Sequence, residues 1–424
     1  MTEVTPARRV AYAVVRRVFE QGAYADRALH AEARGLDGRE RGLAMQLAYG
    51  TVQRRLTLDH LVEQLARPVA ELDAPTLAAL RLGLYQLAFL GGSAPHAVVS
   101  ESVELAKRSG PGFGYKLVNA VLRRALRDAI PPLPADDTSH GAAIAHSYPP
   151  WLVELWWERF GADDARALLR AGNEAGELAL RVNTLVTTPA EVAQALPAPS
   201  RPAGDELPEG LVVDGAFDAH GHALYRRGAY VTQSRGAMLV ARALDPRPGE
   251  RVLDLCAAPG GKTTHLAALM ADRGEIVAVE RHAGRAQALR RTCERLRAGA
   301  VDVRIGDAAR FETDARFDRV LVDPPCSGLG TLQGHPDLRW RMSPQAIDEL
   351  ARAQATILVA ARAALAPGGR LVYSTCTLSP GENEAVVAAS GLQVESERLV
   401  LPHRDRTDGF YIARLRPCCP ARSA

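Results

Sequence analysis

Two cysteines close apolar runs that are typical of buried β-strands. Cys326 ends the run at residues 319–326, and Cys376 ends the run at residues 370–376. In an open parallel α/β sheet, reactive side chains gather at the carboxyl ends of the strands. If these two strands are neighbours, both thiols face one pocket with Asp323 beside them. A thiolate is a strong nucleophile, so the pattern predicts covalent chemistry carried out by sulfur.

The other cysteines carry no comparable signal. The six cysteines of this 424-residue chain are too few for a disulfide scaffold, and none of them forms a Cys-x-x-Cys pair. No metal site is therefore expected. Cys293 lies in a helical pattern and is expected to be a small buried residue, whereas Cys418 and Cys419 are interpreted as incidental.

The residues before Cys326 indicate which atom is modified. Asp323, Pro324 and Pro325 stand where many amino-group methyltransferases have an acid and two prolines, followed there by an aromatic residue. An exocyclic amine has an electron pair with which to attack a methyl group, but carbon 5 of a pyrimidine has none. A thiolate that adds to carbon 6 makes carbon 5 nucleophilic. Cysteine in the aromatic position thus favours methyl transfer to carbon 5, and this chemistry leaves open which thiol attacks.

A glycine-rich turn at residues 254–264 predicts the cofactor site. The turn follows a strand and opens a helix, so a ligand can approach its backbone closely. Cys256 stands where a P-loop has its first glycine, and the turn has no Gly-x-Gly-x-x-Gly, which disfavours nucleoside triphosphates, NAD and FAD. S-adenosylmethionine (SAM) carries no phosphate and suits the turn. Glu280, after the second strand, can bind the ribose of SAM, and Asp307, after the third strand, can bind its adenine. A single acid after a strand is often only a helix cap.

The order of predicted elements indicates several domains. Residues 4–127 have apolar residues three and four apart and read as one helix after another. From residue 250 onward, strands and helices alternate, which indicates a doubly wound parallel sheet. We expect a multidomain fold: an all-α N-terminal domain, a small α+β middle segment and a C-terminal α/β doubly wound (Rossmann-like) domain. The predicted boundaries are a helical domain at 1–130, a linker at 131–145, a small α+β subdomain at 146–240, the Rossmann-like domain at 241–417 and a tail at 418–424.

The strands of the last domain are expected at particular residues. They are 252–255, 276–280, 301–305, 320–323 and 371–375, with added edge strands, one of them suited to an antiparallel position, at 392–397 and 410–415. In the middle segment, strands are expected at 178–182 and 211–213, a helix at 189–196, and a surface loop at 197–210.

Composition narrows the location and the partners. No apolar run approaches the ~20 residues of a membrane-spanning helix, and residues 1–18 lack a signal-peptide pattern, so we expect a cytoplasmic protein. Residues 1–130 hold 18 Lys and Arg against 13 Asp and Glu, a net charge of +5, while the remainder carries −2. This distribution is compatible with a polyanionic partner, and an Arg-rich solvated helical surface explains it as well.

Several motifs resemble those of the Sun/Nop2-type RNA cytosine-5 methyltransferases, over about residues 146–415. They are Asp254-Leu255-Cys256-Ala257-Ala258-Pro259-Gly260-Gly261-Lys262-Thr263, Asp323-Pro324-Pro325-Cys326-Ser327-Gly328-Leu329-Gly330-Thr331, Tyr373-Ser374-Thr375-Cys376-Thr377-Leu378, Glu382-Asn383-Glu384, His335-Pro336-Asp337-Leu338-Arg339-Trp340 and Asp408-Gly409-Phe410-Tyr411. Residues 4–127 resemble the helical RNA-binding domain of NusB-type antitermination factors. The matching stretches there are Arg39-Glu40-Arg41, Tyr49-Gly50-Thr51-Val52 and Asn119-Ala120-Val121-Leu122-Arg123-Arg124. The combination resembles the RsmB/Sun type, which implies a bacterial methyltransferase of small-subunit (16S) ribosomal RNA.

This resemblance implies a role for each site residue. It implies that Cys376 is the nucleophile, that Cys326 assists release of the methylated RNA, and that Asp323 lies at both the catalytic and the cofactor site. It implies a SAM site lined by Cys256, Ala257, Ala258, Pro259, Gly260, Gly261, Lys262, Glu280, Asp307 and Asp323. Two positions depart from the family pattern. Glu280 stands where aspartate is common, and Gln233-Ser234 stands where Gln-Asp is expected, which puts one local contact in doubt.

Other functions stay open on the residues alone. A DNA cytosine-5 methyltransferase would use a cysteine placed like Cys326 as its nucleophile and would not need Cys376. A non-catalytic RNA-binding assembly factor that retains SAM is disfavoured by the intact pair of thiols. For the leading hypothesis we expect ribosomal RNA, free or in an assembling subunit, as the partner, with no metal, no membrane and a monomeric enzyme.

The remaining residues of note have plain structural interpretations. His96 and His335 are expected to be loop or core histidines rather than general bases. The three tryptophans Trp151, Trp156 and Trp157 are expected to be core anchors. Lys262 is either an ordinary first-turn helix residue or a substrate contact.

Overall fold

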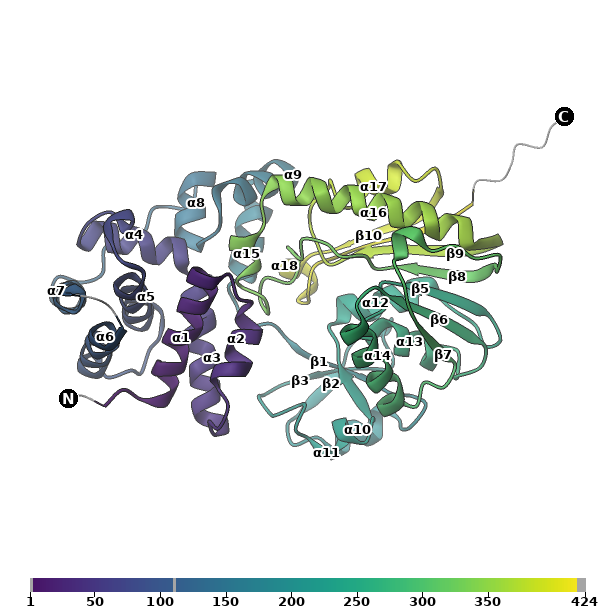
Figure 1. Ribbon diagram of the computed structural model, residues 1–424, viewed down its shortest axis with the longest axis horizontal. Coiled ribbons are helices and arrows are strands. Elements are labelled where there is room, and N and C mark those ends of the chain that lie inside the picture. The colour runs from purple at the N-terminus through teal and green to yellow at the C-terminus, as the bar shows by residue number, and fades with distance from the viewer. Residues whose placement is uncertain (1–2, 110–111, 418–424) are drawn as a thin grey trace. The chain divides into compact units, whose positions relative to one another are not determined.

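The computed structural model describes residues 3–109 and 112–417 and divides the chain into two compact units (Figure 1). The helical unit comprises the chain up to residue 174 together with residues 332–341, and the sheet unit comprises the rest. Cys418, Cys419 and the predicted tail lie outside the described residues. No helix in the described ranges combines the length and the apolar character needed to cross a membrane.

The helical unit consists of α-helices joined by short turns, as predicted for its N-terminal part. Its helices are α1 (Pro6–Gln21), α2 (Ala25–Glu32), α3 (Gly38–Gln53), α4 (Arg55–Leu65), the short 3-10 helix η1 (Val69–Glu71), α5 (Ala74–Phe89), α6 (Pro95–Ser109), α7 (Gly114–Arg127), α8 (Ser139–His146), α9 (Pro150–Ala171) and α15 (Leu338–Arg341). The prediction of an all-α N-terminal domain is therefore confirmed.

Local sequence explains where these helices begin and what they bury. Asp37 accepts a hydrogen bond from the backbone N–H of Glu40 at 2.8 Å at the start of α3, and Asp73 caps α5 in the same way. Each cap satisfies an N–H group that has no partner inside the helix. Leu58 and Leu61, three residues apart on α4, are fully buried, because that spacing places both on one face of the helix.

A segment from far along the sequence folds with the helical unit. Arg339 of residues 332–341 is fully buried. Its guanidinium donates hydrogen bonds to the carbonyl oxygen of Ser147 and to Asn173 Oδ1, both at 3.0 Å, and lies 3.9 Å from the ring centroid of Tyr148. These contacts join residues nearly 200 positions apart, which no local pattern could indicate.

The compact units cut across the boundaries predicted from the sequence. Residues 332–341 fall within the predicted Rossmann-like domain at 241–417 but belong to the helical unit. Helix α9 falls within the predicted subdomain at 146–240 and belongs to the helical unit as well. Helix α8, capped by Thr138, occupies part of the predicted linker at 131–145. The boundaries predicted from the sequence therefore stay predictions, because the compact units divide the chain in a different way.

The sheet unit begins with a small antiparallel sheet in the order β2-β3-β1-β4. Its elements are β1 (Leu178–Val182), α10 (Pro189–Ala195), β2 (Ser200–Pro202), β3 (Gly210–Val213), α11 (Ala223–Arg226) and β4 (Tyr230–Thr232). The expectation of a surface loop at 197–210 is wrong in part, because β2 pairs with β3 there. The prolines in this stretch argued against a strand in the sequence. Pro202 is tolerated because β2 lies at the edge of the sheet.

A seven-stranded sheet forms the core of the sheet unit, in the order β10-β11-β9-β8-β5-β6-β7. Its strands are β5 (Arg251–Leu255), β6 (Glu275–Glu280), β7 (Val301–Ile305), β8 (Phe317–Val322), β9 (Leu365–Thr375), β10 (Gln393–Val400) and β11 (Phe410–Arg416). Strands β5 to β9 are parallel and β11 is antiparallel to both its neighbours, which confirms the doubly wound fold. Of the two strands that were expected to be added at an edge, β10 does lie at the edge of the sheet. The expectation that 410–415 is also an edge is wrong, because β11 inserts between β9 and β10.

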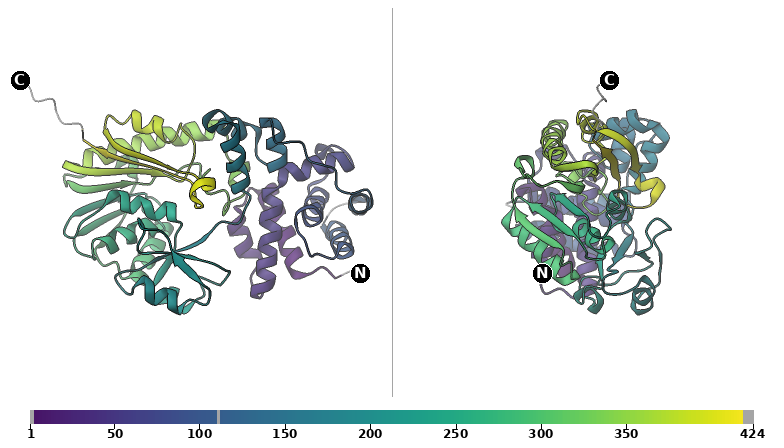
Figure 2. Two further views of the ribbon diagram at one scale, coloured as in Figure 1. Left: turned by 180° about the vertical axis from the view of Figure 1, so that it is seen from behind. Right: turned by 90° about the vertical axis from the view of Figure 1, so that its right-hand side faces the viewer.

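Helices cover both faces of this sheet (Figures 1 and 2). They are α12 (Arg235–Leu244), α13 (Gly261–Leu269) and α14 (Ala283–Leu296) on one face, and α16 (Pro344–Ala364) and α17 (Glu384–Ala388) on the other; the short η2 (Ala308–Arg310) and α18 (Pro402–Asp405) lie in loops. Along β8, Val320 and Val322 pack toward α16, while Leu321 between them packs toward the opposite helices. This alternation explains the continuous apolar run, since both faces of the strand are buried.

Candidate active site

The two cysteines predicted to act together meet in the structure. Cys326 follows β8 and Cys376 follows β9, and these strands are neighbours in the sheet. The sulfur of Cys326 lies 3.3 Å from the sulfur of Cys376, within hydrogen-bonding distance for thiols. Both side chains are half-buried, so the pair can be reached by a substrate.

The surroundings distinguish the two sulfurs. The hydrogen bond to Cys376, burial and the negative charge of Cys376 together raise the pKa of Cys326 well above the ordinary value of a thiol. Cys326 is therefore a neutral S–H group placed to donate a hydrogen bond to the sulfur of Cys376. A thiolate that accepts a hydrogen bond is stabilised, so a neutral Cys326 is placed to support negative charge that develops on the sulfur of Cys376.

Lys262 brings a positive charge to the same place. Its Nζ lies 2.7 Å from Asp323 Oδ2 and 5.1 Å from the ring centroid of Phe410. Burial alone would lower the pKa of Lys262, but the charges of Asp323 and Cys376 raise it, so the ammonium stays charged. Asp323 also accepts a hydrogen bond from Ser374 Oγ at 2.9 Å. Lys262 lies in the first turn of α13, as one of its two interpretations expected, and the substrate contact stays a prediction.

A buried polar network fixes the loops that carry the cysteines. Glu382 Oε1 accepts hydrogen bonds from the backbone N–H of Ser327 at 2.8 Å and from Gln354 Nε2 at 3.0 Å, and Oε2 accepts from the Ser327 hydroxyl. Ser327 Oγ lies 2.6 Å from Thr377 Oγ1. Since Ser327 follows Cys326 and Thr377 follows Cys376, this one carboxylate ties both cysteine loops together. All four of these side chains are fully buried.

Removing the carboxylate of Glu382 is expected to destabilise the protein. A Glu382→Ala variant leaves the buried Ser327 and Gln354 donors without an acceptor, so the free energy of unfolding should fall by about 2–3 kcal/mol. The exposed Glu349 on α16 supplies a matched control, because Glu349→Ala should change it by less than ~0.5 kcal/mol. Urea unfolding of the full chain measures both. Equal stabilities for the two variants would show that the network does not hold the loops.

The predicted cofactor turn between β5 and α13 has a fixed shape. Thr263 Oγ1 donates to Asp254 Oδ2 at 2.6 Å, and burial raises the pKa of Asp254 to about 7. Gly260 has φ +102°, and a Cβ at this position would lie 2.6 Å from Leu289 Cδ1. Only glycine fits such a backbone without strain. The turn therefore presents its main chain and the start of α13 as a preformed surface.

The residues around this turn fit SAM. The Nε2 of Gln233 is buried and has no hydrogen-bond partner in the described part of the chain, and its amide lies against Gly261, so it is a donor suited to a carboxylate. Glu280 ends β6, is buried, and uses Oε1 to accept a hydrogen bond from the N–H of His282 at 2.8 Å. Its second oxygen lies 3.6 Å from Arg285 and can also accept from ribose hydroxyls.

The remaining predicted cofactor residues have defined places too. Asp307 follows β7 and accepts from the N–H of Ala309 at 3.1 Å, so it is also the cap of η2 that the sequence offered as an alternative. Ala257, Ala258 and Pro259 form the turn itself, and Arg285 Nη2 donates to the Ala258 carbonyl at 2.8 Å. Burial and nearby carboxylates raise the pKa of Cys256 to about 12, so this thiol is neutral and lines the turn.

Arg181 supports the cofactor turn from the small sheet, a contribution absent from the sequence predictions. Its fully buried guanidinium donates from Nε to Gln233 Oε1 at 2.7 Å and from Nη2 to Thr264 Oγ1 at 2.8 Å. Ser234, where aspartate is common in the family pattern, caps α12 through the N–H of Ala237. The sequence did hold a signal for this contact: Arg181 stands within an otherwise apolar strand, and an arginine buried there requires specific hydrogen-bond acceptors.

The residues predicted to be structural differ in how deeply they are buried. Trp156 is buried and packs against Tyr148, with 5.7 Å between ring centroids, while Trp151 and Trp157 are half-buried. Cys293 is buried as predicted, and burial raises its pKa to about 12. His96 and His335 are exposed. Over the described ranges, no group of three or more His, Cys, Asp or Glu side chains is arranged to hold a metal ion.

Comparison with known proteins decides the family. Residues 241–393 match the family model described as 16S rRNA methyltransferase RsmB/F, residues 5–127 match the NusB family, and residues 148–220 match the ferredoxin-like domain of RsmF/B-like methyltransferases. The chain is 36% identical to a Synechocystis protein named "Probable ribosomal RNA small subunit methyltransferase B", covering 97% of this chain and 99% of that protein. The chain belongs to the RsmB family. It is a SAM-dependent RNA methyltransferase.

Further relatives agree with this assignment. The ribosomal RNA small subunit methyltransferase B of Yersinia enterocolitica is 32% identical, covering 96% of this chain and 98% of that protein. The crystal structure of PH0851 matches 98% of this chain and 99% of its own, with a TM-score of 0.82 and 24% identity, which shows the shared fold. A methyltransferase homologue from Pyrococcus horikoshii matches 66% of this chain and 99% of its own, with a TM-score of 0.60 and 26% identity.

Proposed function

We propose that this enzyme methylates carbon 5 of a cytidine in small-subunit ribosomal RNA through a covalent adduct between Cys376 and carbon 6 of the base. The observation that carries the proposal is the pair of sulfurs 3.3 Å apart, in which Cys326 is a neutral donor and Lys262 supplies a positive charge. Methyl transfer to a nitrogen or to a ribose hydroxyl needs no such pair, because those atoms already have an electron pair to donate.

The first step is the addition of sulfur to the base. The thiolate of Cys376 forms a bond to carbon 6, and the electron pair of the carbon 5–carbon 6 double bond moves to carbon 5. Asp323, which is ion-paired with Lys262, can accept a hydrogen bond from the exocyclic amine and orient the ring. SAM, held at the turn before α13, would supply the methyl group. The electron pair on carbon 5 would form the new carbon–carbon bond as the sulfur–methyl bond breaks, and neutral S-adenosylhomocysteine would be left at the turn.

The second step releases the product. Carbon 5 now carries a methyl group and a proton, and a base removes that proton. The electrons of the broken carbon–hydrogen bond re-form the double bond, and the sulfur of Cys376 leaves as a thiolate. The S–H group of Cys326 stabilises this leaving group through the hydrogen bond between the two sulfurs.

The position of methylation can be measured through the proton that is lost. Small-subunit ribosomal RNA carrying tritium at carbon 5 of cytidine is incubated with wild-type protein and SAM. One tritium atom should enter water for each methyl group transferred, and the labelled nucleoside should be 5-methylcytidine. Methyl transfer without tritium release would place the methyl group elsewhere and contradict the proposal. A DNA substrate serves as the comparison that tests the alternative polymer.

We also propose that the enzyme acts in the cytoplasm as a monomer on ribosomal RNA, free or in an assembling subunit. The net charge of +5 on residues 1–130 supports a polyanionic partner for the helical unit. Light scattering of the full chain measures its oligomeric state, and a dimer mass would contradict the monomer.

A further inference from the structure

The two sulfurs of the candidate active site lie close enough to form a bond with each other. The sulfur of Cys326 is 3.3 Å from the sulfur of Cys376. A disulfide bond is about 2.05 Å long, so the two sulfurs need to approach by only ~1.2 Å. Rotation of the two side chains can supply such a movement, and the fold does not have to rearrange.

The strands that carry the cysteines also suit a disulfide. Val322 of β8 pairs with Tyr373 of β9, and Cys326 and Cys376 follow these partners by four and three residues. Neighbouring strands lie about 4.8 Å apart, and a disulfide usually joins Cα atoms that are about 4.4–6.8 Å apart. The buried carboxylate of Glu382 holds the two cysteine loops together. The pair is therefore already arranged for bond formation.

The pair is also better placed for oxidation than the other cysteines that the structure describes. Both thiols are half-buried, so a small oxidant can reach them. Cys293 is buried in the core. Burial and nearby carboxylates raise the pKa of Cys256 to about 12, and the thiolate is the form that reacts. Cys256 and Cys293 are therefore expected to react much more slowly.

We propose that Cys326 and Cys376 form a reversible disulfide when hydrogen peroxide reaches the active site, and that this bond stops methyl transfer. The loss of activity rests on the proposed function, in which Cys376 is the nucleophile, whereas the formation of the disulfide does not. In the oxidised pair, no sulfur is free to add to carbon 6, and no S–H group remains to assist release of the product.

One molecule of hydrogen peroxide is consumed for each disulfide. The sulfur of Cys376 attacks one oxygen of the peroxide, and the oxygen–oxygen bond breaks. This step oxidises the sulfur to a sulfenic acid, and the released hydroxide takes up the proton of the Cys376 thiol to give water. The sulfur of Cys326 then attacks the sulfur of Cys376. The sulfur–sulfur bond forms, the sulfur–oxygen bond breaks, and the leaving hydroxide takes the proton of Cys326 to give a second water.

The first step makes Cys326 more reactive in the second step. In the reduced protein, the hydrogen bond to Cys376, burial and the negative charge of Cys376 raise the pKa of Cys326. Two of these three causes come from Cys376, and the negative charge is gone once its sulfur carries a neutral S–OH group. Cys326 can then lose its proton more readily beside the sulfur that it attacks. Its attack prevents further oxidation of Cys376 to a sulfinic acid, which thiol reductants do not reverse.

The test treats the full chain with an excess of hydrogen peroxide and then removes the peroxide with catalase. Mass mapping of the unreduced digest should find the Cys326 and Cys376 peptides joined, with the loss of two hydrogen atoms. Methyl transfer to small-subunit ribosomal RNA should fall toward the ~10³-fold loss expected without the Cys376 sulfur. Dithiothreitol should restore the rate. The affinity for SAM should not change, because the turn before α13 takes no part in the bond.

Two variants serve as controls. A Cys418→Ser/Cys419→Ser variant lacks the thiols of the tail, and it should be inactivated and restored as the wild type is. A Cys326→Ser variant lacks the thiol that closes the disulfide. Peroxide should therefore oxidise its Cys376 to a sulfinic acid, which mass mapping detects and dithiothreitol does not reverse.

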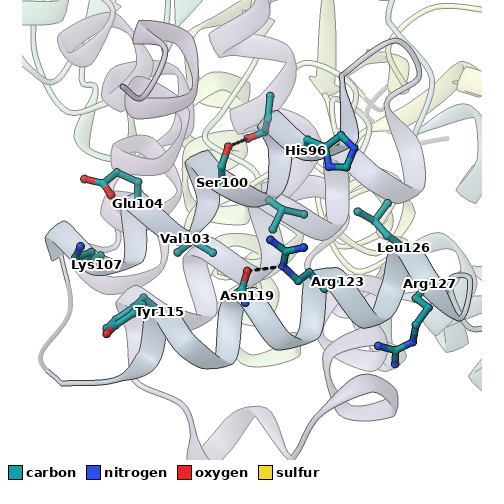
Figure 3. Close-up of a pocket in the computed structure, with 12 residues that line it drawn as sticks. His96, Ser100, Val103, Glu104, Lys107, Tyr115, Asn119, Arg123, Leu126 and Arg127 are labelled. Carbon is teal, nitrogen blue, oxygen red and sulfur yellow. Dashed lines mark hydrogen bonds between the residues drawn. The ribbon is translucent and has the colours of Figure 1, made fainter. Parts of the chain in front are cut away.

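The helical unit should not be changed by formation of the disulfide. This unit contains no cysteine, and none of the side chains that line its groove between α6 and α7 contains sulfur (Figure 3). The far-UV circular dichroism of the oxidised protein should therefore match that of the reduced protein. A large change would assign the loss of activity to unfolding and contradict the inference.

The mass map decides whether the disulfide forms. Free thiols at both positions after treatment, a bond from Cys376 to Cys256, or a sulfinic acid on Cys376 of the wild type would each overturn the inference. A complete disulfide with unchanged methyl transfer would contradict both the switch and the proposed nucleophile. If the untreated wild type transfers no methyl group to RNA, the proposed function fails by itself, and the mass map still shows whether the two sulfurs join.

Discussion

A Cys376→Ala variant is expected to transfer methyl groups to RNA at least ~10³-fold more slowly than the wild type and to form no covalent protein–RNA adduct. Without the sulfur, no group can add to carbon 6, and carbon 5 keeps too little electron density to take up a methyl group. The affinity for SAM should stay unchanged, because the cofactor turn and Glu280 are intact. Single-turnover transfer from labelled SAM measures the rate, and a denaturing gel detects the adduct.

The matched control for this variant is Cys293→Ala. Cys293 is another cysteine of the sheet unit, but it belongs to α14 and is buried in the core. Its replacement should leave the rate of methyl transfer near that of the wild type. If Cys376→Ala keeps full activity while the Cys293→Ala control behaves normally, Cys376 is not the nucleophile.

A Cys326→Ala variant is expected to behave in the opposite way and to accumulate the covalent adduct. The change removes the S–H donor that stabilises the sulfur of Cys376 when it leaves carbon 6. A hydrogen bond to a charged group contributes about 1.5–3 kcal/mol, so the release step should slow by about 10- to 150-fold. Addition and methyl transfer do not need this donor, and a first round of methylation should therefore still occur. The adduct should appear on a denaturing gel and contain the methyl label.

The pair of variants also distinguishes the RNA-type from the DNA-type arrangement of a cytosine-5 methyltransferase, the two alternatives considered from the sequence. If Cys326→Ala forms no adduct while Cys376→Ala forms one, the roles are exchanged and the arrangement is that of a DNA cytosine-5 methyltransferase. Adducts in neither variant, together with methyl transfer in both, would mean that no thiol adds to the base.

Much of the sheet unit could be predicted from local sequence. The apolar runs around Val320 and Leu371 are short and lack polar interruptions, because parallel strands are buried on both faces. Their order along the chain, with helical runs between them, restricts the topology to a doubly wound sheet. The meeting of Cys326 and Cys376 followed from that topology, since the ends of neighbouring parallel strands lie at one edge.

The contacts that could not be predicted are those between distant polar residues. Nothing in the sequence near Glu382 indicates that its carboxylate bonds Ser327 and Gln354, and the salt bridge of Lys262 with Asp323 joins residues 61 positions apart. Arg339 is a further example. It donates to the backbone carbonyl of Ser147, and a backbone carbonyl leaves no trace in the residue types of the sequence. Apolar periodicity reports which face of an element is buried, but it does not report which polar partners satisfy each other.

The most direct test of the account locates the bond between protein and RNA. Wild-type protein, with both cysteines present, is incubated with SAM and small-subunit ribosomal RNA that contains 5-fluorocytidine. Fluorine at carbon 5 cannot leave as a proton does, so the adduct persists after methyl transfer. Mass spectrometry of the digested adduct should find the nucleotide on the peptide that contains Cys376. A nucleotide on the Cys326 peptide, or methylated RNA without any adduct, would contradict the account.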